Sequence, residues 1–448
     1  MTLRAQAPAE RSPDPTSGER IAWIPAPATV EGTGIRRVML DELAIKTIAR
    51  EREMTTRALS DAIALPGPVV DDIFQQLRKA QLVEVTGMTG TVYRITLTAA
   101  GRARADALLA MNQYVGPAPV SLEAYSERSL AQSIAGAGVR PDDVRRAFEP
   151  LVLEDEFVRR LGIAVASGAP IVLTGPSGTG KTSIAACIPK AFGRGVFLPH
   201  AVEVAGQIIV LFDPGVHRPI PVTAPAEHDR RWIYCERPFI VSGGELTMDM
   251  LDLQYNPTSG YYAAPPQMKA NTGVFVIDDF GRQRVRPEEL LNRWIVPLDR
   301  GVDFLTLHGG GKFAIPFAVL VVFATNLDAS VGFADENRPG ISDTAFLRRI
   351  PNKIHVGYAS REQFHEIFRR VCADAGLTYD HTLVERLVDV MAKQVKEPLR
   401  ACIPRDLVRH VTWEAQYDGV PPELSAATLA RACETYFAIQ APGGLRQS

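Results

Sequence analysis

Residues 175–182 carry the most specific chemical signal in this sequence. They read Gly-Pro-Ser-Gly-Thr-Gly-Lys-Thr and match in full the phosphate-binding pattern Gly-x4-Gly-Lys-Ser/Thr. Glycines let such a loop curl so that successive backbone N–H groups point at one anion. The lysine reaches the β- and γ-phosphates, and the last hydroxyl is a ligand for Mg²⁺. The segment therefore predicts binding of a nucleoside triphosphate together with Mg²⁺.

This chemistry requires a strand before the loop and a helix after it. Apolar residues 171–173 predict a short buried strand, and residues 183–188 are compatible with a helix. With both flanks present, a glycine-rich turn without a ligand is the weaker interpretation. We expect the phosphate contacts to come from Gly175, Pro176, Ser177, Gly178, Thr179, Gly180, Lys181, Thr182 and Ser183.

A second apolar run, residues 273–277, ends in Asp278 and Asp279. It predicts a buried parallel strand that presents carboxylates at its C-terminal end, where ligands collect. We expect Asp278 to hold Mg²⁺ together with Thr182, and Asp279 to orient or deprotonate the attacking water. Two acids after an apolar run are a weak signal alone, but they become strong downstream of a complete phosphate loop.

The composition sets the class of protein. The chain has 448 residues, 46% hydrophobic and 22% charged, with a net charge of −2. These values are typical of a globular protein of about two to three domains, without a general attraction to nucleic acid or membrane. The five cysteines form no Cys-x-x-Cys pair and support no metal or redox site. Without a signal peptide pattern or a long apolar run, we expect a cytoplasmic protein with no membrane span.

The N-terminal part has its own pattern. Residues 1–35 are rich in Pro, Ala, Ser, Thr and Gly and predict a disordered or loosely docked tail. Residues 36–112 predict a compact domain of three helices, a hairpin and a closing helix, at 38–52, 57–63, 69–80, 83–97 and 101–110. This order resembles the winged helix-turn-helix family. Residues 113–150 predict a partly ordered linker with helical patches at 122–134 and 141–148.

The winged-helix resemblance raises two functions, DNA binding and protein docking. Residues 69–80 would be the helix that enters a major groove. Asp71 and Asp72 occupy the first half of this helix, where they would meet phosphate charge, and the hairpin tip at 87–90 has no basic residue. These charges disfavour DNA, and we expect the domain to dock a protein client or adaptor.

Downstream of the loop, the order of elements resembles the AAA+ ATPases, and within them the MoxR-like and helix-2-insert group. The resemblance rests on the apolar strand to Asp278-Asp279, a helix, a hairpin, the apolar strand to Ala324-Thr-Asn326, and Ala345-Phe-Leu-Arg-Arg-Ile350. It covers about residues 151–441. It implies an α/β fold with a P-loop AAA+ core at 151–358, a parallel sheet flanked by helices, and a helical lid at 359–442.

The same resemblance assigns roles. It implies ATP as the nucleotide, a ring-shaped homo-oligomer that is usually a hexamer, and Asn326 as the residue that hydrogen-bonds the attacking water or γ-phosphate. It implies that Arg348 or Arg349 is an arginine finger acting in the neighbouring subunit's site, with Arg349 favoured because it directly precedes an apolar residue. Arg405, in Ile403-Pro-Arg-Asp-Leu407, resembles a second sensor that faces the γ-phosphate from the lid of the same subunit.

One residue departs from the family pattern. The second acid is usually Glu, and Asp279 is shorter by one methylene. Its reach to water is reduced, so slow turnover is an alternative to fast hydrolysis. We therefore expect an ATP-driven remodeller of a protein partner, with a DNA-associated ATPase and a slow nucleotide-gated scaffold as alternatives.

Two further segments allow more than one interpretation. Gly260-Tyr-Tyr262 is either an aromatic pore loop or a solvent-exposed aromatic turn or packed insert, and the second interpretation is favoured. The turn His308-Gly-Gly-Gly-Lys312 could be a second phosphate cradle, but no helix follows it. A plain hairpin turn is the better interpretation.

Overall fold

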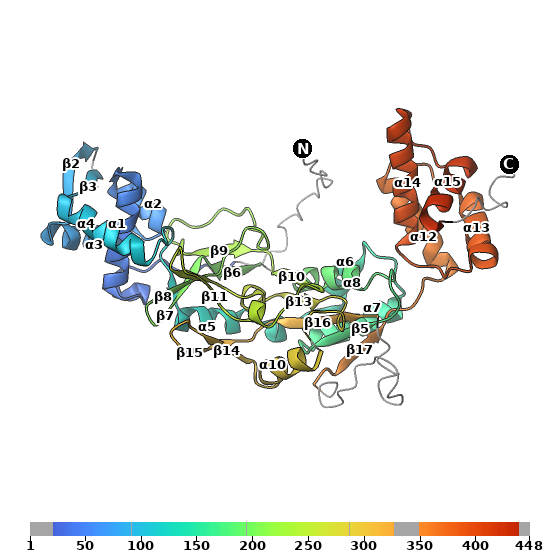
Figure 1. Ribbon diagram of the computed structural model, residues 1–448, viewed down its shortest axis with the longest axis horizontal. Coiled ribbons are helices and arrows are strands. Elements are labelled where there is room, and N and C mark those ends of the chain that lie inside the picture. Colours follow the sequence, from blue (N-terminus) through green and yellow to red (C-terminus); the bar gives the residue numbers. More distant parts are fainter. Residues whose placement is uncertain (1–20, 91, 194, 286, 327–348, 439–448) are drawn as a thin grey trace.

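The computed structural model describes residues 21–90, 92–193, 195–285, 287–326 and 349–438 of the chain. Figure 1 shows three parts along the long axis: helices and a small sheet at one end, two larger sheets in the middle, and a helical group at the other end. We call the first part the N-terminal unit (residues 37–111) and the last the C-terminal unit (residues 361–437).

Five parallel strands form the central sheet, in the order β10-β13-β16-β5-β17. They are β5 (Ile171–Thr174), β10 (Phe239–Ser242), β13 (Val274–Ile277), β16 (Leu320–Thr325) and β17 (Asn352–His355). Every residue of β5, β13 and β16 is buried, which explains why these strands read as continuous apolar runs. Thr174 is in register with Thr325, and Ile277 with Phe323. The segments that follow these three strands therefore meet at one edge of the sheet.

Helices cover both faces of this sheet (Figure 1). They are α6 (Pro141–Phe148), α7 (Asp155–Ala166) and α8 (Lys181–Cys187) on one face and α10 (Pro287–Arg300) on the other. Successive side chains of β16 point to opposite faces of the sheet and therefore pack in different clusters. Leu320 and Val322 pack in the cluster that includes α6, α7 and α8, whereas Val321 and Phe323 pack with Trp294 of α10. The predicted α/β fold with a P-loop AAA+ core is confirmed.

A second, mixed sheet adjoins the first and has the order β11-β12-β8-β7-β4. Its strands are β4 (Val120–Ser121), β7 (Ala201–Val204), β8 (Gln207–Val210), β11 (Gln254–Asn256) and β12 (Tyr261–Ala263). Two antiparallel pairs accompany it, formed by β6 (Val196–Pro199) with β9 (Trp232–Cys235) and by β14 (Val302–Thr306) with β15 (Lys312–Pro316). Four short helices lie between the longer elements: η2 (Ile134–Gly136) before α6, η3 (Ile188–Phe192) after α8, η4 (Asp249–Leu251) before β11 and α9 (Pro266–Lys269) before β13.

Residues 113–150, predicted as a partly ordered linker with helical patches at 122–134 and 141–148, contain α5 (Leu122–Ala131) and α6 and also take part in the second sheet. β4 pairs with β7, and α5 packs behind it. Tyr125 of α5 is only 1% exposed, and its hydroxyl accepts a hydrogen bond of 2.6 Å from the Asn271 side chain. These residues are a structural part of the second sheet, because a buried tyrosine that finds its polar partner fixes the segment in place.

The N-terminal unit contains the predicted helices and hairpin. Its elements are α1 (Arg37–Glu51), β1 (Glu53–Thr55), α2 (Thr56–Ile63), α3 (Gly67–Lys79), β2 (Val83–Thr89), β3 (Val92–Leu97) and α4 (Ala99–Met111), with sheet order β1-β3-β2. Its core continues into the second sheet through Ala201 and Ile208. Arg230 adds hydrogen bonds of 2.9 Å to the carbonyl oxygens of Ser60 and Leu65. The unit is thus packed onto the central part of the molecule.

Of the two alternatives for the tail at 1–35, the docked one holds for residues 21–35, while residues 1–20 lie outside the described residues. The Trp23 ring lies 5.4 Å from that of Phe197, and the Ala26 N–H donates to the carbonyl oxygen of Glu227 at 2.8 Å. After the 3-10 turn η1 (Glu31–Thr33), Ile35 is buried in the core of the N-terminal unit. A few large side chains of this proline-rich segment therefore pack against the second sheet region and the core of the N-terminal unit.

The C-terminal unit is helical, as predicted. Its elements are α12 (Arg361–Asp374), α13 (His381–Val390), the π-helical turn η6 (Met391–Val395), α14 (Ile403–Asp418) and α15 (Ala426–Phe437). They enclose a separate core that includes Phe364, Leu387 and Leu407. Across the described residues, no helix has the length and apolar character needed to cross a membrane.

Candidate active site

The loop between β5 and α8 contains glycines in backbone conformations that favour glycine. Gly175, Gly178 and Gly180 have φ angles of 138°, 78° and 94°. A Cβ at Gly175 would lie 2.1 Å from the carbonyl oxygen of Val356, just after β17. The loop is therefore pressed against the exit of a neighbouring strand, and a side chain at 175 would force the two apart.

The same loop touches the C-terminal unit. The Cys402 N–H donates to the carbonyl oxygen of Gly178 at 3.1 Å. A Cβ at Gly178 would lie 2.7 Å from Cys402 Sγ and 3.4 Å from Arg400 Cδ. The segment that starts α14 thus lies directly on the phosphate loop, and glycine at 178 permits that approach.

Lys181, the first residue of α8, is buried under the loop. Its ammonium donates hydrogen bonds to the carbonyl oxygens of Gly175 and Pro176, both at 2.8 Å, and to Asn326 Oδ1 at 2.7 Å. Burial lowers the pKa of Lys181, and the two carboxylates that follow β13 oppose this effect. The cation is held where its hydrogen bonds can be exchanged for charge-assisted bonds to phosphate oxygens.

The other polar side chains of the loop differ in their exposure to solvent. Thr179 is buried and its hydroxyl donates to the Pro176 carbonyl at 3.0 Å, inside the loop. Ser177 and Ser183 are exposed. The backbone of the loop, more than these hydroxyls, supplies the donors for an anion.

The residues predicted to hold Mg²⁺ are brought together. Thr182 Oγ1 donates to Asp278 Oδ2 at 2.7 Å, from α8 to the residue after β13. The other oxygen of Asp278 accepts the Asp279 N–H at 3.0 Å. A hydroxyl and a carboxylate are the hard oxygen ligands that Mg²⁺ uses beside phosphates. The donor set at this position fits Mg²⁺.

Asp279 and Asn326 form a second pair at the same edge of the sheet. Asn326 Nδ2 donates to Asp279 Oδ1 at 3.1 Å, while its Oδ1 accepts from Lys181. Asp279 has a φ of 49°, in the left-handed region that is uncommon outside glycine. The strand end thereby turns its second acid toward β16. Asn326 connects the lysine of the loop to the acid predicted to act on water.

Arg349 lies elsewhere in the chain's own fold. It precedes β17, which runs parallel to β5 with Asn352 in register with Ile171. The phosphate loop leaves the opposite end of β5, roughly 13 Å farther along for a four-residue strand. Arg349 Nε donates to the two oxygens of Asp299 on α10, at 3.0 and 2.8 Å. Arg348 lies outside the described residues.

The lid residue that lies on the phosphate loop differs from the one that the sequence indicated. Arg405 is on the first turn of α14, half exposed, and its Nε donates to Asp406 at 3.2 Å. Arg400 instead lies against Gly178, and its guanidinium is 3.1 Å from a carboxylate oxygen of Glu397. Its Nε is buried, with no hydrogen-bond partner among the described residues. Arg400 is not among the residues predicted for the site, because no motif distinguishes it from other arginines.

The two ambiguous segments are packed structure. Tyr262 is 3% exposed, and its hydroxyl accepts the His308 N–H at 2.9 Å. Tyr261 contacts Tyr114, with ring centroids 5.8 Å apart. The turn at 307–311 closes the β14–β15 hairpin, with Thr306 in register with Lys312. The interpretations of a packed insert and of a plain hairpin are confirmed.

Comparisons with known proteins add the following. A family model described as "Domain of unknown function (DUF8689)" matches residues 360–435. None of the curated proteins matches the chain. Among solved structures, the chain is similar to a RuvB variant from Thermotoga maritima, with 15% identity, 66% of this chain and 70% of that chain covered, and a TM-score of 0.33.

The chain is also similar to the solved structure of NtrX from Brucella abortus in complex with ATP. The two are 14% identical, the match covers 68% of this chain and 55% of that chain, and the TM-score is 0.37. We assign the AAA+ fold from the sheet order and the phosphate loop of this chain, and not from these likenesses.

Proposed function

We propose that this protein is a Mg²⁺-dependent ATPase of the MoxR-like group. The observation that carries the proposal is the convergence, at one edge of the parallel sheet, of a phosphate loop, a hydroxyl–carboxylate pair and an acid–amide pair. Phosphoryl transfer needs positioning and charge neutralisation more than covalent chemistry. Mg²⁺, held by Thr182 and Asp278, would neutralise charge on the phosphates.

The chain's own residues supply the remaining steps. The loop N–H groups and the Lys181 ammonium bind the phosphates, which releases Asn326 Oδ1 from its bond to the lysine. Asp279 and Asn326, already hydrogen-bonded to each other, then position the attacking water. Asp279 in place of the usual Glu shortens the reach to that water, so we expect slow turnover.

Asp279→Asn should keep ATP binding and lose most hydrolysis, because it removes the acceptor of the water's proton without changing the size of the side chain. The rate should fall on the order of 10²-fold or more. Phosphate release measured at saturating ATP and Mg²⁺ tests this. Asp142→Asn, on an exposed acid of α6, is the matched control and should be neutral. A variant at 279 with the wild-type rate would remove the proposed role.

Arg400 should contribute to ATP affinity more than Arg405, because it is the arginine in contact with the loop. Arg400→Gln should weaken ATP binding on the order of 10-fold, as expected for hydrogen bonds to a charged group of about 1.5–3 kcal/mol. Calorimetric titration with ATP and Mg²⁺ measures it, with Arg409→Gln on α14 as an exposed control. If Arg405→Gln weakens binding and Arg400→Gln does not, the second-sensor role stays with Arg405.

We further propose that subunits assemble head to tail into a ring, which the family resemblance implies to be hexameric. The position of Arg349 supports this, because it lies at the edge of the sheet opposite to its own phosphate loop and is accessible to a neighbour. A residue that acts in the next subunit's site closes a ring when the rotation permits it.

The N-terminal unit, with its winged-helix-like element order, is proposed to dock a cytoplasmic protein partner that the ATPase remodels. Asp71 and Asp72 are both exposed on α3, and Arg37 pairs with Asp72. The acidic start of α3 opposes approach to a phosphate backbone. Because the unit is packed onto the second sheet, a partner bound to it is mechanically connected to the ATPase core.

A further inference from the structure

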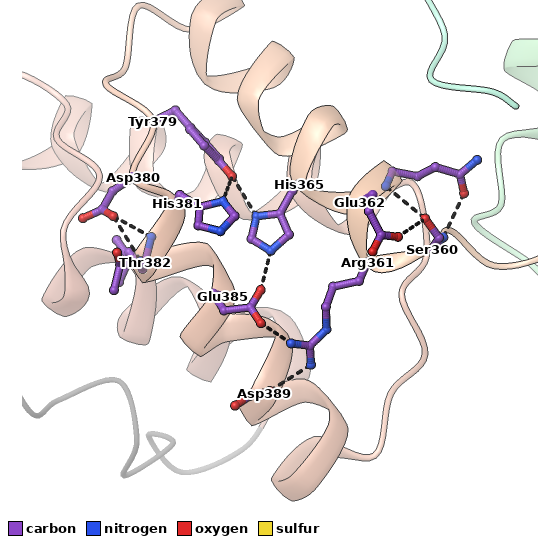
Figure 2. A network of polar contacts seen from close by, with 12 residues as sticks. Ser360, Arg361, Glu362, His365, Tyr379, Asp380, His381, Thr382, Glu385 and Asp389 are labelled. Carbon is purple, nitrogen blue, oxygen red and sulfur yellow. Dashed lines mark hydrogen bonds and ion pairs between the residues drawn. The ribbon is translucent and has the colours of Figure 1, made fainter.

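Two histidines and a glutamate meet between α12 and α13, far from the phosphate loop along the chain (Figure 2). They are His365 of α12 and His381 and Glu385 of α13. One potential ligand atom from each residue lies within 4.8 Å of the others. The two imidazole rings stack, with centroids 4.4 Å apart. We propose that these three side chains bind one Zn²⁺ ion.

The site is built on rigid elements. His381 is the first residue of α13, and Glu385 follows one turn later on the same face. Asp380 fixes the start of this helix, since its Oδ1 accepts the N–H groups of Thr382 at 2.8 Å and Leu383 at 3.2 Å. His365 projects from the facing helix α12 (Figure 2). Ligands on two packed helices keep their spacing better than ligands on loops.

The surrounding hydrogen bonds orient the donor atoms. The Tyr379 hydroxyl lies 2.7 Å from Nδ1 of His365, while Nε2 of His365 lies 2.6 Å from Oε2 of Glu385. Arg361 pairs with the other oxygen of Glu385 and with Asp389. Such outer partners are what metal-binding imidazoles and carboxylates have. Nε2 of His365 and Oε2 of Glu385 point at each other, as Figure 2 shows, so an ion would bind between them in place of their hydrogen bond.

The distances between the potential ligand atoms lie on either side of the distance expected around a bound Zn²⁺. With Zn–N and Zn–O bonds of about 2.1 Å, tetrahedral ligand atoms lie about 3.4 Å apart. The bond between His365 and Glu385 is shorter than this, and the outer limit of 4.8 Å is longer. Binding of Zn²⁺ would therefore open the His365–Glu385 pair slightly and turn the exposed His381 side chain out of its stack on His365.

The donor set selects the metal class. Two imidazoles and one carboxylate are a common three-residue set for Zn²⁺, with water in the fourth position, whereas Mg²⁺ prefers oxygen ligands throughout. An ion here would tie the start of α13 to α12. Helix α12 also contacts the core, since Arg370 donates to the carbonyl oxygen of Glu149 at 2.7 Å. The cluster lies within the region matched by the domain of unknown function.

The test uses the full chain, stripped of metal with a chelator and titrated with ZnCl₂ in the absence of nucleotide. We expect one Zn²⁺ per chain and an increase in melting temperature on binding. His381→Ala and Glu385→Gln should each weaken binding by 10-fold or more and abolish the thermal shift. His381 is exposed, so its variant is expected to fold. His410→Ala, on α14 of the same unit, is the matched control and should bind as the wild type does.

The remaining outcomes would overturn the proposal. The proposal is wrong if the wild-type protein does not bind Zn²⁺ stoichiometrically. It is also wrong if the His381→Ala and Glu385→Gln chains bind Zn²⁺ as the wild type does. Binding that is lost in Asp278→Asn but kept in His381→Ala would place the ion at the phosphate loop instead. Because no nucleotide is present, these results do not depend on the proposed ATPase activity.

Discussion

Lys181→Met is expected to lower ATP affinity by on the order of 10²-fold or more, the largest binding effect in the chain. The ammonium is the buried cation of the phosphate loop, hydrogen-bonded to two loop carbonyls and to Asn326. Methionine keeps the apolar stem packed and removes the charge together with the hydrogen bonds of the ammonium. The phosphates would then be bound by backbone N–H groups alone. Calorimetric titration with ATP and Mg²⁺ gives the dissociation constant directly.

The control for this variant is Lys190→Met. Lys190 is exposed at the end of the same helical segment, and its replacement should leave ATP affinity unchanged. Thermal unfolding of both variants shows whether the loss of the Lys181 hydrogen bonds affects the fold. Wild-type affinity in a folded Lys181→Met chain would remove the phosphate loop from the proposed site.

The parts of the site that depend on local sequence were predictable. The loop pattern places Lys181 and Thr182 by itself, and a strand buried on both faces reads as an unbroken apolar run. Polar residues at the ends of such runs must lie at one edge of a parallel sheet. The positions of Asp278 and Asn326 follow from this rule, and the structure brings both to the loop.

The contacts that depend on tertiary packing were not predictable. Arg400 lies on Gly178 although more than two hundred residues separate them in the chain, and no spacing rule connects the two. The Zn²⁺ donors come from two helices and form no local motif, because His365 and His381 become neighbours only when α12 packs on α13. The left-handed backbone conformation of Asp279 was also not predictable, because it depends on the tertiary packing around this residue.

Composition did not indicate how firmly two segments are packed. Residues 21–35 and 113–131 contain prolines and small residues and therefore resemble a tail and a partly ordered linker. Each is docked by large side chains at a few positions, Trp23 in one and Tyr125 in the other. One buried aromatic ring contributes as much apolar area as several small residues. The average composition of a segment therefore does not indicate whether a single aromatic side chain packs it onto the rest of the protein.

Arg349→Ala is expected to preserve ATP binding and to reduce hydrolysis on the order of 10³-fold, as for other arginines that act on a neighbour's phosphates. Hydrolysis should therefore require assembly of the subunits, because Arg349 lies at the opposite edge of the sheet from the phosphate loop of its own subunit. One of its partners in the same chain is Asp299. Steady-state ATP hydrolysis at concentrations where the ring is assembled measures the loss.

The ion pair with Asp299 supplies the control. The two side chains are 29% and 41% exposed, and a pair of this kind contributes about 0–1 kcal/mol to stability. If Arg349 only braced α10 through this pair, Asp299→Asn would be as inactive as Arg349→Ala. We expect Asp299→Asn to retain hydrolysis, because the arginine stays available to the neighbouring subunit.

Mixed assemblies decide whether the arginine acts in the neighbouring subunit. An Arg349→Ala subunit keeps its own Lys181, and a Lys181→Met subunit keeps its own Arg349. In a mixed ring, activity returns wherever an intact arginine faces an intact loop, so the mixture should exceed either variant alone. A residue acting within its own subunit gives no such rescue. Co-assembled mixtures without rescue would transfer the role from Arg349 to another residue, and Arg348 would be tested next.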